Sequence, residues 1–406
     1  MTLNLTRLGG PLDQMGRELA QREDTYRQLL AMALQWLAAY SADVIPLRAR
    51  AERARDIMGW RGAIPADEQL MSAHPLPPHP SRLGLVAADG SQIEPDRHGA
   101  ALYALINIGS IVMELGTGRT PQADSEPTLY YTEDDLYEDK RLLQGNLLDT
   151  RRDIGELAKL AELAPKVATR PVVTLTDGTL LLWVLDESPP ARRKLRLGRY
   201  LACLDRLKSE GVAVAAFTSR PRYADVVNLL HLASLGEDFG QQLEENPLEG
   251  LTDRALFMFL RPGERSALFA SGTPVNAEYR RHDPDDEIFF FYMNVGDEEY
   301  SEIARVEVPR WVATQRLAGW SPADWPGDYR LLDLIQAAIY AQCRLTDGYP
   351  YVLARAHELA LVSVEEQRDL ERRVITAMAR HGIWARRSEK ARLKELTGSG
   401  RRRHTL

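Results

Sequence analysis

The sequence is poor in cysteine and has no long apolar run. Its two cysteines, Cys203 and Cys343, belong to no CxxC or Cys/His cluster, which argues against a disulfide framework and a structural zinc site. We therefore expect a reducing cytoplasm as its location. No run of about 18 apolar residues is present, which excludes a membrane-spanning helix. Residues 1–24 carry charges throughout, which predicts no secretory signal there.

Several motifs of catalysis are also missing. The chain has no GxxxxGK[ST] loop, which argues against nucleotide hydrolysis by a P-loop. It has no GxSxG elbow and no HExxH pair either. The net charge of −7 is not the basic balance typical of a nucleic-acid binder, although an acidic enzyme can still contain a basic cleft. At 406 residues the chain is long enough for one large domain or two ordinary ones.

Two similar stretches carry the strongest chemical signal. Residues 83–93, LGLVAADGSQI, form an apolar run that ends at Asp89, and residues 172–181, VVTLTDGTLL, repeat the pattern around Asp177. Asp-Gly is an ordinary turn dipeptide, so each stretch alone is explained without chemistry. Two strands that both end in Asp-Gly-Ser/Thr can instead bring two carboxylates to one edge of a sheet.

The remaining pattern predicts an α/β protein with a mixed central sheet flanked by helices. Residues 120–140 are acidic and indicate a loop, and residues 100–118 indicate two antiparallel strands or one bent strand. The aromatic run at 289–292 indicates a buried strand, with base stacking as the alternative. Further strands are predicted at 212–219 and in two paired segments around 287–313. Helices are predicted at 12–58, 142–163, 192–210, 222–235, 329–343, 352–361 and 364–381.

The acidic residues suit a hard metal ion. Asp89 and Asp177 offer the oxygen ligands that Mg²⁺ and Mn²⁺ prefer, and Glu156 on a helix can complete a three-carboxylate cluster. His357 can add a ligand or exchange a proton. Such a set supports attack of water on a phosphodiester with one or two ions, about 3.5–4 Å apart in two-metal sites. Glu156 can also be a solvated partner of a preceding arginine, and His357 a buried structural histidine.

Seven segments, in this order, resemble the NurA nuclease family over about residues 83–365. They are AADGSQ (87–92), RRDIGELAKLAEL (151–163) followed by TLTDGTLL (174–181), FTSR (217–220), LTDRALFMFLRPGERSALF (251–269), FFFYMNVG (289–296), ARVEVPRWVA (304–313) and DGYPYVLARAHELALVS (347–363). The resemblance implies an RNase H-like core with a divalent-metal site, Mn²⁺ first and Mg²⁺ as the alternative. It also implies a 5′→3′ DNA nuclease on single and double strands that cuts single strands internally.

The family's site residues transfer to five positions of this sequence. The two aspartates fall on Asp89 and Asp177, the helix glutamate on Glu156, and the C-terminal pair on Tyr349 and His357. The resemblance leaves Glu162 and Glu114 as alternatives to Glu156. Arg220 and Arg254 are the candidates for phosphate contacts.

The resemblance further implies partners and a domain plan. Family members form homodimers and act with a HerA-type hexameric DNA-translocating ATPase, in end resection for double-strand break repair or in phage defence. We predict an N-terminal helical region with a Pro-rich linker at 1–80, the nuclease domain at 81–382 and a flexible basic tail at 383–406. A catalytically inactive adaptor for the ATPase and a phosphoesterase for small substrates are the competing hypotheses. The N-terminal helices can dock at the dimer interface or on the ATPase.

Overall fold

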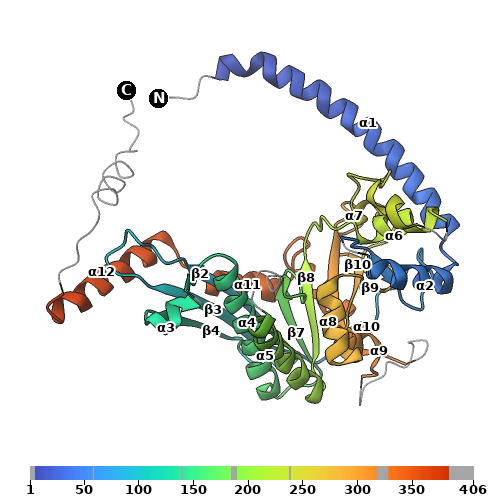
Figure 1. The fold of residues 1–406 in the computed structure, drawn as a ribbon. Coiled ribbons are helices and arrows are strands. Elements are labelled where there is room, and N and C mark those ends of the chain that lie inside the picture. The colour runs from blue at the N-terminus through green and yellow to red at the C-terminus, as the bar shows by residue number, and fades with distance from the viewer. Residues whose placement is uncertain are drawn as a thin grey trace. The chain divides into compact units, whose positions relative to one another are not determined.

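The structure is a computed structural model that describes residues 5–57, 59–138, 140–183, 190–236, 239–317 and 328–383. Nine strands form a mixed sheet in the order β1-β9-β10-β11-β8-β7-β2-β3-β4. The chain divides into two compact units, and Figure 1 labels their elements. The first unit takes residues from 1–80, 177–181 and 213–351, and the second takes residues from 81–176, 182–212 and 352–406.

The first unit contains the long N-terminal helix and the antiparallel strands β9, β10 and β11. Its helices are α1 (Gly9–Ala39), α2 (Val44–Arg55), α6 (Asp225–Ser234), α7 (Asp253–Leu256), α8 (Pro274–His282), α9 (Arg310–Thr314) and α10 (Leu331–Cys343). Its strands are β1 (Ala63–Pro65), β8 (Ala213–Thr218), β9 (Phe269–Ser271), β10 (Ile288–Asn294) and β11 (Ile303–Pro309). The predicted pairing of the two segments around 287–313 is confirmed, because β10 and β11 pair along their whole length.

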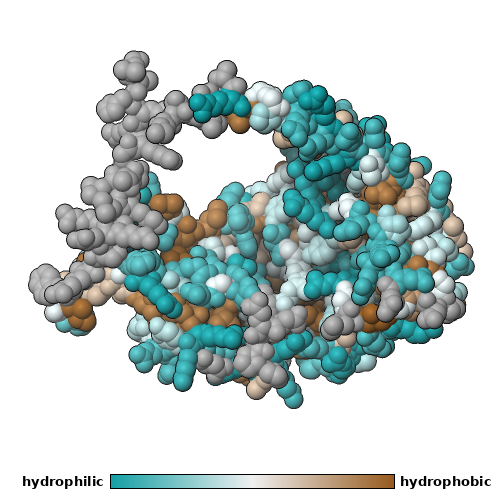
Figure 2. All heavy atoms as spheres, turned by 45° about the horizontal axis from the view of Figure 1, so that its top comes forward, coloured by the Kyte–Doolittle hydropathy of each residue, from teal (hydrophilic) through white to brown (hydrophobic). Residues whose placement is uncertain are grey.

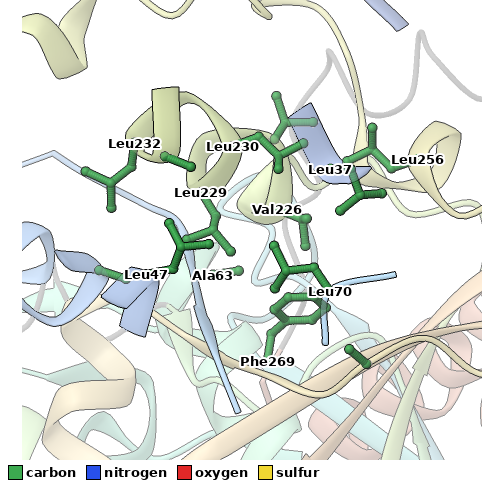
Figure 3. Close-up of a cluster of buried hydrophobic side chains, with 14 of the residues drawn as sticks. Leu37, Leu47, Ala63, Leu70, Val226, Leu229, Leu230, Leu232, Leu256 and Phe269 are labelled. Atoms are coloured by element: carbon green, nitrogen blue, oxygen red, sulfur yellow. The ribbon is translucent and has the colours of Figure 1, made fainter. Parts of the chain in front are cut away.

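Figure 3 shows the apolar core of the first unit, where helices and strands from distant parts of the sequence meet. Leu37 of α1 and Leu47 of α2 lie in it with Phe269 of β9. The α6 helix contributes most, because apolar residues on several of its sides are buried. Each buried leucine or phenylalanine contributes about 1.5–3 kcal/mol relative to an exposed one. This cluster therefore anchors the C-terminal end of α1 to the unit.

The second unit is built on four strands. They are β2 (Leu83–Ile93), β3 (Ala104–Leu115), β4 (Gln122–Tyr130) and β7 (Val172–Asp177), the last residue of β7 being counted with the first unit. A two-stranded ribbon accompanies them, β5 (Tyr137–Glu138) and β6 (Arg141–Leu142). The helices are α3 (Glu133–Leu136), α4 (Asn146–Leu163), α5 (Pro190–Ser209), α11 (Tyr351–Ala360) and α12 (Val364–Arg380). The α4 helix packs on β2 and β3 and against α5.

The strand order of this unit is RNase H-like, as the sequence predicts. β4, β3 and β2 are antiparallel neighbours, and β7 then pairs with β2 in parallel. One prediction is wrong here, because residues 122–130 form β4 and not a loop. Eight of the nine side chains in β4 are exposed, so the strand shows no apolar alternation. Its charged residues suit an edge strand, where they oppose pairing with other chains.

Two other predicted elements differ in detail. Residues 12–58 contain two helices, because Pro46 cannot continue α1 and occupies the first turn of α2. Residues 104–115 form the single strand β3. Phe290, Phe291 and Tyr292 are fully buried, which confirms the core interpretation of the aromatic run. The predicted basic tail lies outside the described residues from 384 onward.

Most of the visible surface in Figure 2 is hydrophilic, and apolar residues appear there in small groups. No single helix among the described residues is both long and apolar enough to cross a membrane. The pair α1 and α2, bent by 117°, reaches that length and composition only when the two helices are counted together.

Candidate active site

Asp89 lies near the end of the buried part of β2. The six residues before it, 83–88, are buried, and the exposure of the strand rises from Asp89 onward. In the parallel pairing with β7, Ala88 lies opposite Thr176. Asp89 and Asp177 are each the next residue along their strand. The parallel pairing stops just before the two aspartates, but β2 continues to Ile93, so the prediction that both strands end in Asp-Gly is wrong for β2.

His357 reaches Asp89 from α11. Its Nδ1 lies 2.6 Å from Oδ2 of Asp89, within hydrogen-bonding distance. The side chain of His357 is 56% exposed and that of Asp89 is 15% exposed. The histidine is therefore not the buried structural residue that its apolar neighbours in sequence allow. His357 is therefore a solvent-exposed side chain in contact with a largely buried carboxylate.

The position of His357 depends on how closely α11 packs on β3. A Cβ atom on Gly109 would lie far inside van der Waals contact with Ala360 N and Ala356 O of that helix. Nδ2 of Asn107 donates to Ala360 O at 2.8 Å, and the hydroxyl of Ser91 donates to the same carbonyl. These contacts satisfy a carbonyl at the end of the helix, which has no intrahelical partner. These hydrogen bonds hold α11 at Ala360, about one helical turn after His357.

Glu156 is buried on the face of α4 that covers β2. Its Oε1 lies 3.3 Å from Nε of Arg152, so the predicted pairing with a preceding arginine is present. The glutamate is only 8% exposed, however, and is not a solvated surface residue. A Cβ atom on Gly90 would lie 2.7 Å from Oε1 of Glu156. The absence of a side chain at Gly90, the residue after Asp89, therefore leaves room for this carboxylate.

The two alternative glutamates are engaged elsewhere. Glu114 lies opposite Gly84 in the β2–β3 pairing, whereas Asp89 lies opposite Gly109. Hydrogen bonds from Thr169, with Arg119 nearby, lower the pKa of Glu114. Glu162 binds Lys166 and Lys159, which lower the pKa of its carboxyl group. Both glutamates have cationic or hydroxyl partners away from Asp89.

Asp177 and Tyr349 belong to the first unit. Asp177 ends β7 and is exposed, and Gly178 after it has a φ of +85°. A positive φ favours glycine, which explains the Asp-Gly pair at this turn. Tyr349 is half-buried, with its ring edge-on to Phe217 at a centroid distance of 5.6 Å. It precedes α11, as the sequence predicts.

The two predicted phosphate-binding arginines share one carboxylate. Nε of Arg220 lies 3.3 Å from Oε1 of Glu302, and a terminal nitrogen of Arg254 lies 3.7 Å from Oε2. The Arg220 side chain is 70% exposed and the Glu302 side chain 9%. Two cationic side chains therefore share one carboxylate.

Three residues that the structure shows to be important were not identified from the sequence. Asn107 and Gly109 hold α11, but both lie inside an apolar run whose partner is about 250 residues away in sequence. A third missed residue is Glu307, a fully buried carboxylate on β11. Its sequence signal is a pair of charged residues, Arg305 and Glu307, within an otherwise apolar strand at 303–309, where burial requires that each has a partner.

The predicted ligands are of residue types that suit a hard divalent ion. Asp89 and Glu156 provide carboxylate oxygens, and His357 provides an imidazole nitrogen. Mn²⁺ and Mg²⁺ prefer such ligands to thiolates. Another aspartate–histidine pair occurs in the first unit, where His282 Nδ1 lies 2.8 Å from Asp286 Oδ2. None of the residues predicted from the sequence belongs to that pair.

Comparison with known proteins gives one family match. The model of the NurA domain matches residues 84–362, which is more than half of the chain. All five predicted site residues and both arginines lie within the matched range. No curated protein matches the chain.

Solved structures with similarity to this chain include nucleases. The NurA nuclease from Sulfolobus solfataricus is 13% identical, covers 91% of this chain and 98% of its own, and has a TM-score of 0.45. A structure of NurA with manganese is 10% identical, covers 81% and 96%, and has a TM-score of 0.40. The catalytic domain of human endonuclease V is 12% identical, covers 83% and 97%, and has a TM-score of 0.33.

Proposed function

Because the chain belongs to the NurA family, we propose that it is a divalent-metal-dependent deoxyribonuclease that hydrolyses phosphodiester bonds. The observation that carries the proposal is the contact of Asp89 with His357, together with the buried Glu156 packed against Gly90, the residue after Asp89. The proposed metal ligands are Asp89, Glu156, Asp177 and His357. Mn²⁺ is the proposed ion, and Mg²⁺ is the alternative.

The side chains divide the work of such a reaction. When bound, the ion supplies Lewis-acid stabilisation of phosphoryl charge and lowers the pKa of a bound water. The contact of His357 Nδ1 with Asp89 fixes the imidazole ring and leaves Nε2 to bind the ion or to exchange a proton. Tyr349 is proposed to donate its hydroxyl hydrogen to a phosphate oxygen of the substrate.

Arg220 and Arg254 are proposed to bind the DNA backbone. Their shared partner Glu302 neutralises only one of the two positive charges. A phosphate can therefore be attracted to this place, and the exposed Arg220 can reach it most easily. Such contacts position DNA without reading its sequence.

The finer activities and the partners extend the same proposal. We propose 5′→3′ degradation of single- and double-stranded DNA, internal cleavage of single strands, and a homodimer that acts with a HerA-type hexameric ATPase. The biological role would be end resection in double-strand break repair, or phage defence. The net charge of −7 supports a dependence of tight DNA binding on the ATPase. Equal affinity with and without the ATPase would contradict that dependence.

The test of the proposal is cleavage of labelled linear DNA by the full chain, with Mn²⁺ and with chelator. Wild type should degrade the DNA only with metal. Asp89→Asn should cleave DNA at least about 100-fold more slowly than wild type. Loss of a group that only orients a metal ligand lowers activity about 10–100-fold, and loss of the ligand itself should have at least as large an effect. Asp13→Asn on α1, which removes an exposed carboxylate, is the matched control and should cleave like wild type.

Two results would contradict the proposal. If wild type does not degrade DNA even with the ATPase present, the chain is better described as an inactive adaptor. If Asp89→Asn cleaves as fast as wild type, the assigned site is wrong.

A further inference from the structure

The turn that follows Asp177 is held by a fully buried glutamate on β11. The hydroxyl of Thr179 donates to Oε2 of Glu307 at 2.6 Å, and the backbone N–H of Leu180 donates to the same oxygen at 3.0 Å. Thr179 Oγ1 in turn accepts a hydrogen bond from Leu181 N at 3.0 Å. One carboxylate oxygen therefore fixes the second and third residues after Asp177.

The same turn has other anchors on its backbone. Gly178 N donates to Phe217 O at 2.9 Å, and the hydroxyl of Thr218 donates to Gly178 O. The hydroxyl of Tyr279 donates to Leu180 O at 2.9 Å. These bonds tie the turn to β8 and α8. Unlike these backbone and hydroxyl anchors, Glu307 binds the turn with a charged group.

Glu307 is itself held rigidly from the other side. Its Oε1 accepts a hydrogen bond from Nε of Arg305 at 2.9 Å, and Arg305 also binds Asp225 at 2.7 Å. The guanidinium carbon of Arg305 lies 3.6 Å from the ring centroid of Phe290 and 4.1 Å from that of Tyr223. Charge-assisted bonds and flat aromatic contacts leave Arg305 little freedom to move.

The two oxygens of Glu307 thus have different partners. Oε1 completes a buried ion pair within the core, while Oε2 binds the turn at the end of β7. A core ion pair needs only the first of these contacts. The second explains why a buried carboxylate lies opposite Ala216 of β8, the neighbour of Phe217.

We propose that Glu307 is a positioning residue that acts through Thr179 and Leu180 to hold Asp177 in the orientation needed to bind a divalent ion. The inference rests on the proposed function, because it takes Asp177 to be a metal ligand. Groups that orient the ligands of a metal typically change its affinity by 10–100-fold when they are removed. Glu307 would belong to this class.

Thr179→Val tests the inference most cleanly, because it keeps the side-chain shape and leaves the bond between Arg305 and Glu307 in place. The probe is Mn²⁺ itself, titrated into the full chain at a temperature where every variant is folded. Thr179→Val should bind Mn²⁺ about tenfold more weakly than wild type. Thr179→Ser, which keeps the hydroxyl, should restore most of the affinity.

Glu68→Gln is the matched control for lost stability. Glu68 also forms a buried ion pair in the first unit, with Arg265 at 2.9 Å, and it accepts hydrogen bonds from Arg265 and from the backbone N–H of Leu268. This variant should unfold at a lower temperature and bind Mn²⁺ like wild type. If Thr179→Val binds Mn²⁺ as tightly as Thr179→Ser, the inference is overturned.

Asp177→Asn separates this inference from the proposed function. If Asp177→Asn loses Mn²⁺ affinity while Thr179→Val retains it, Asp177 is a ligand and the positioning role of Glu307 is wrong. If Asp177→Asn binds Mn²⁺ like wild type, the ligand assignment fails, and the positioning role fails with it.

Discussion

Three glutamates of the second unit show how the surroundings of a residue decide its role. Glu156, Glu162 and Glu114 all lie between the two aspartates in sequence, and the sequence does not separate them. In the structure Glu156 packs against Gly90, the residue that follows Asp89 in β2. Glu162 is held by two lysines, and Glu114 by Thr169 and Arg119. Glu156 also has a cationic partner, Arg152, so its burial and its place against Gly90 are what distinguish it from the other two.

Substitution of these glutamates by glutamine gives a direct comparison. We expect Glu156→Gln to lower Mn²⁺-dependent DNA cleavage at least about 100-fold, as for loss of a metal ligand. Glu114→Gln should reduce the melting temperature, because it weakens the bond to Thr169, and leave the cleavage rate within about threefold. Cleavage rates and thermal unfolding of both variants are the measurements. Loss of cleavage in Glu114→Gln but not in Glu156→Gln would reverse the assignment.

At the scale of elements, the contact between α11 and β3 decides where His357 lies. Gly109→Ala would place a Cβ atom into the backbone of α11 near Ala356 and Ala360. Backbone cannot move aside as a flexible side chain can, so the helix must shift. We expect a loss of about 1–3 kcal/mol in the free energy of unfolding, typical of overpacking. Mn²⁺ affinity should fall as well, because His357 moves away from Asp89.

Gly155→Ala is the control for that substitution. Gly155 lies inside α4, and a Cβ atom there would meet Ile108 of β3 at an ordinary 3.5 Å. Alanine inside a helix should stabilise the protein by up to about 1 kcal/mol relative to glycine. Chemical denaturation and Mn²⁺ titration of both variants check the pair. Unchanged stability in Gly109→Ala would show that α11 packs less closely than the structure indicates.

Elements with a one-dimensional pattern could be predicted from the sequence, and contacts between distant residues could not. The apolar run before Asp89 predicts β2, and apolar spacing predicts α4 and α10. β4 was not predicted because its side chains are exposed, so the sequence shows no apolar alternation and only the pairing with β3 identifies the strand. The roles of Asn107 and Glu307 could not be predicted either, for a different reason. Their partners are far away in sequence, and nothing local identifies them.

At the scale of the whole molecule, much of the charge is paired inside the fold. Arg265 is 1% exposed at its side chain and forms two bonds with Glu68, at 2.9 and 3.0 Å. Burial alone would raise the pKa of Glu68, but hydrogen bonds from His74 and Arg265 outweigh it and lower the pKa well below the usual 4.5. Folding therefore favours the ionised carboxylate, and the stability of the first unit depends on pH.

The sign of this dependence follows from the lowered pKa. Above about pH 4.5 the carboxylate is ionised in both states and the ion pair contributes fully; as the pH falls below that value, the unfolded chain takes up the proton first and stability is lost. We expect Glu68→Gln to cost about 3 kcal/mol at pH 7, because it leaves Arg265 buried without its carboxylate. The difference between wild type and variant should shrink as the pH is lowered toward 3, about 1.5 units below the usual pKa.

Denaturant unfolding at a series of pH values measures that difference. Glu23→Gln is the matched control, since Glu23 pairs with Arg27 on the exposed surface of α1. An exposed pair contributes only about 0–1 kcal/mol, so this variant should follow wild type at every pH. A difference between Glu68→Gln and wild type that stays constant from pH 7 to 3 would mean that the pair contributes by packing and not by charge.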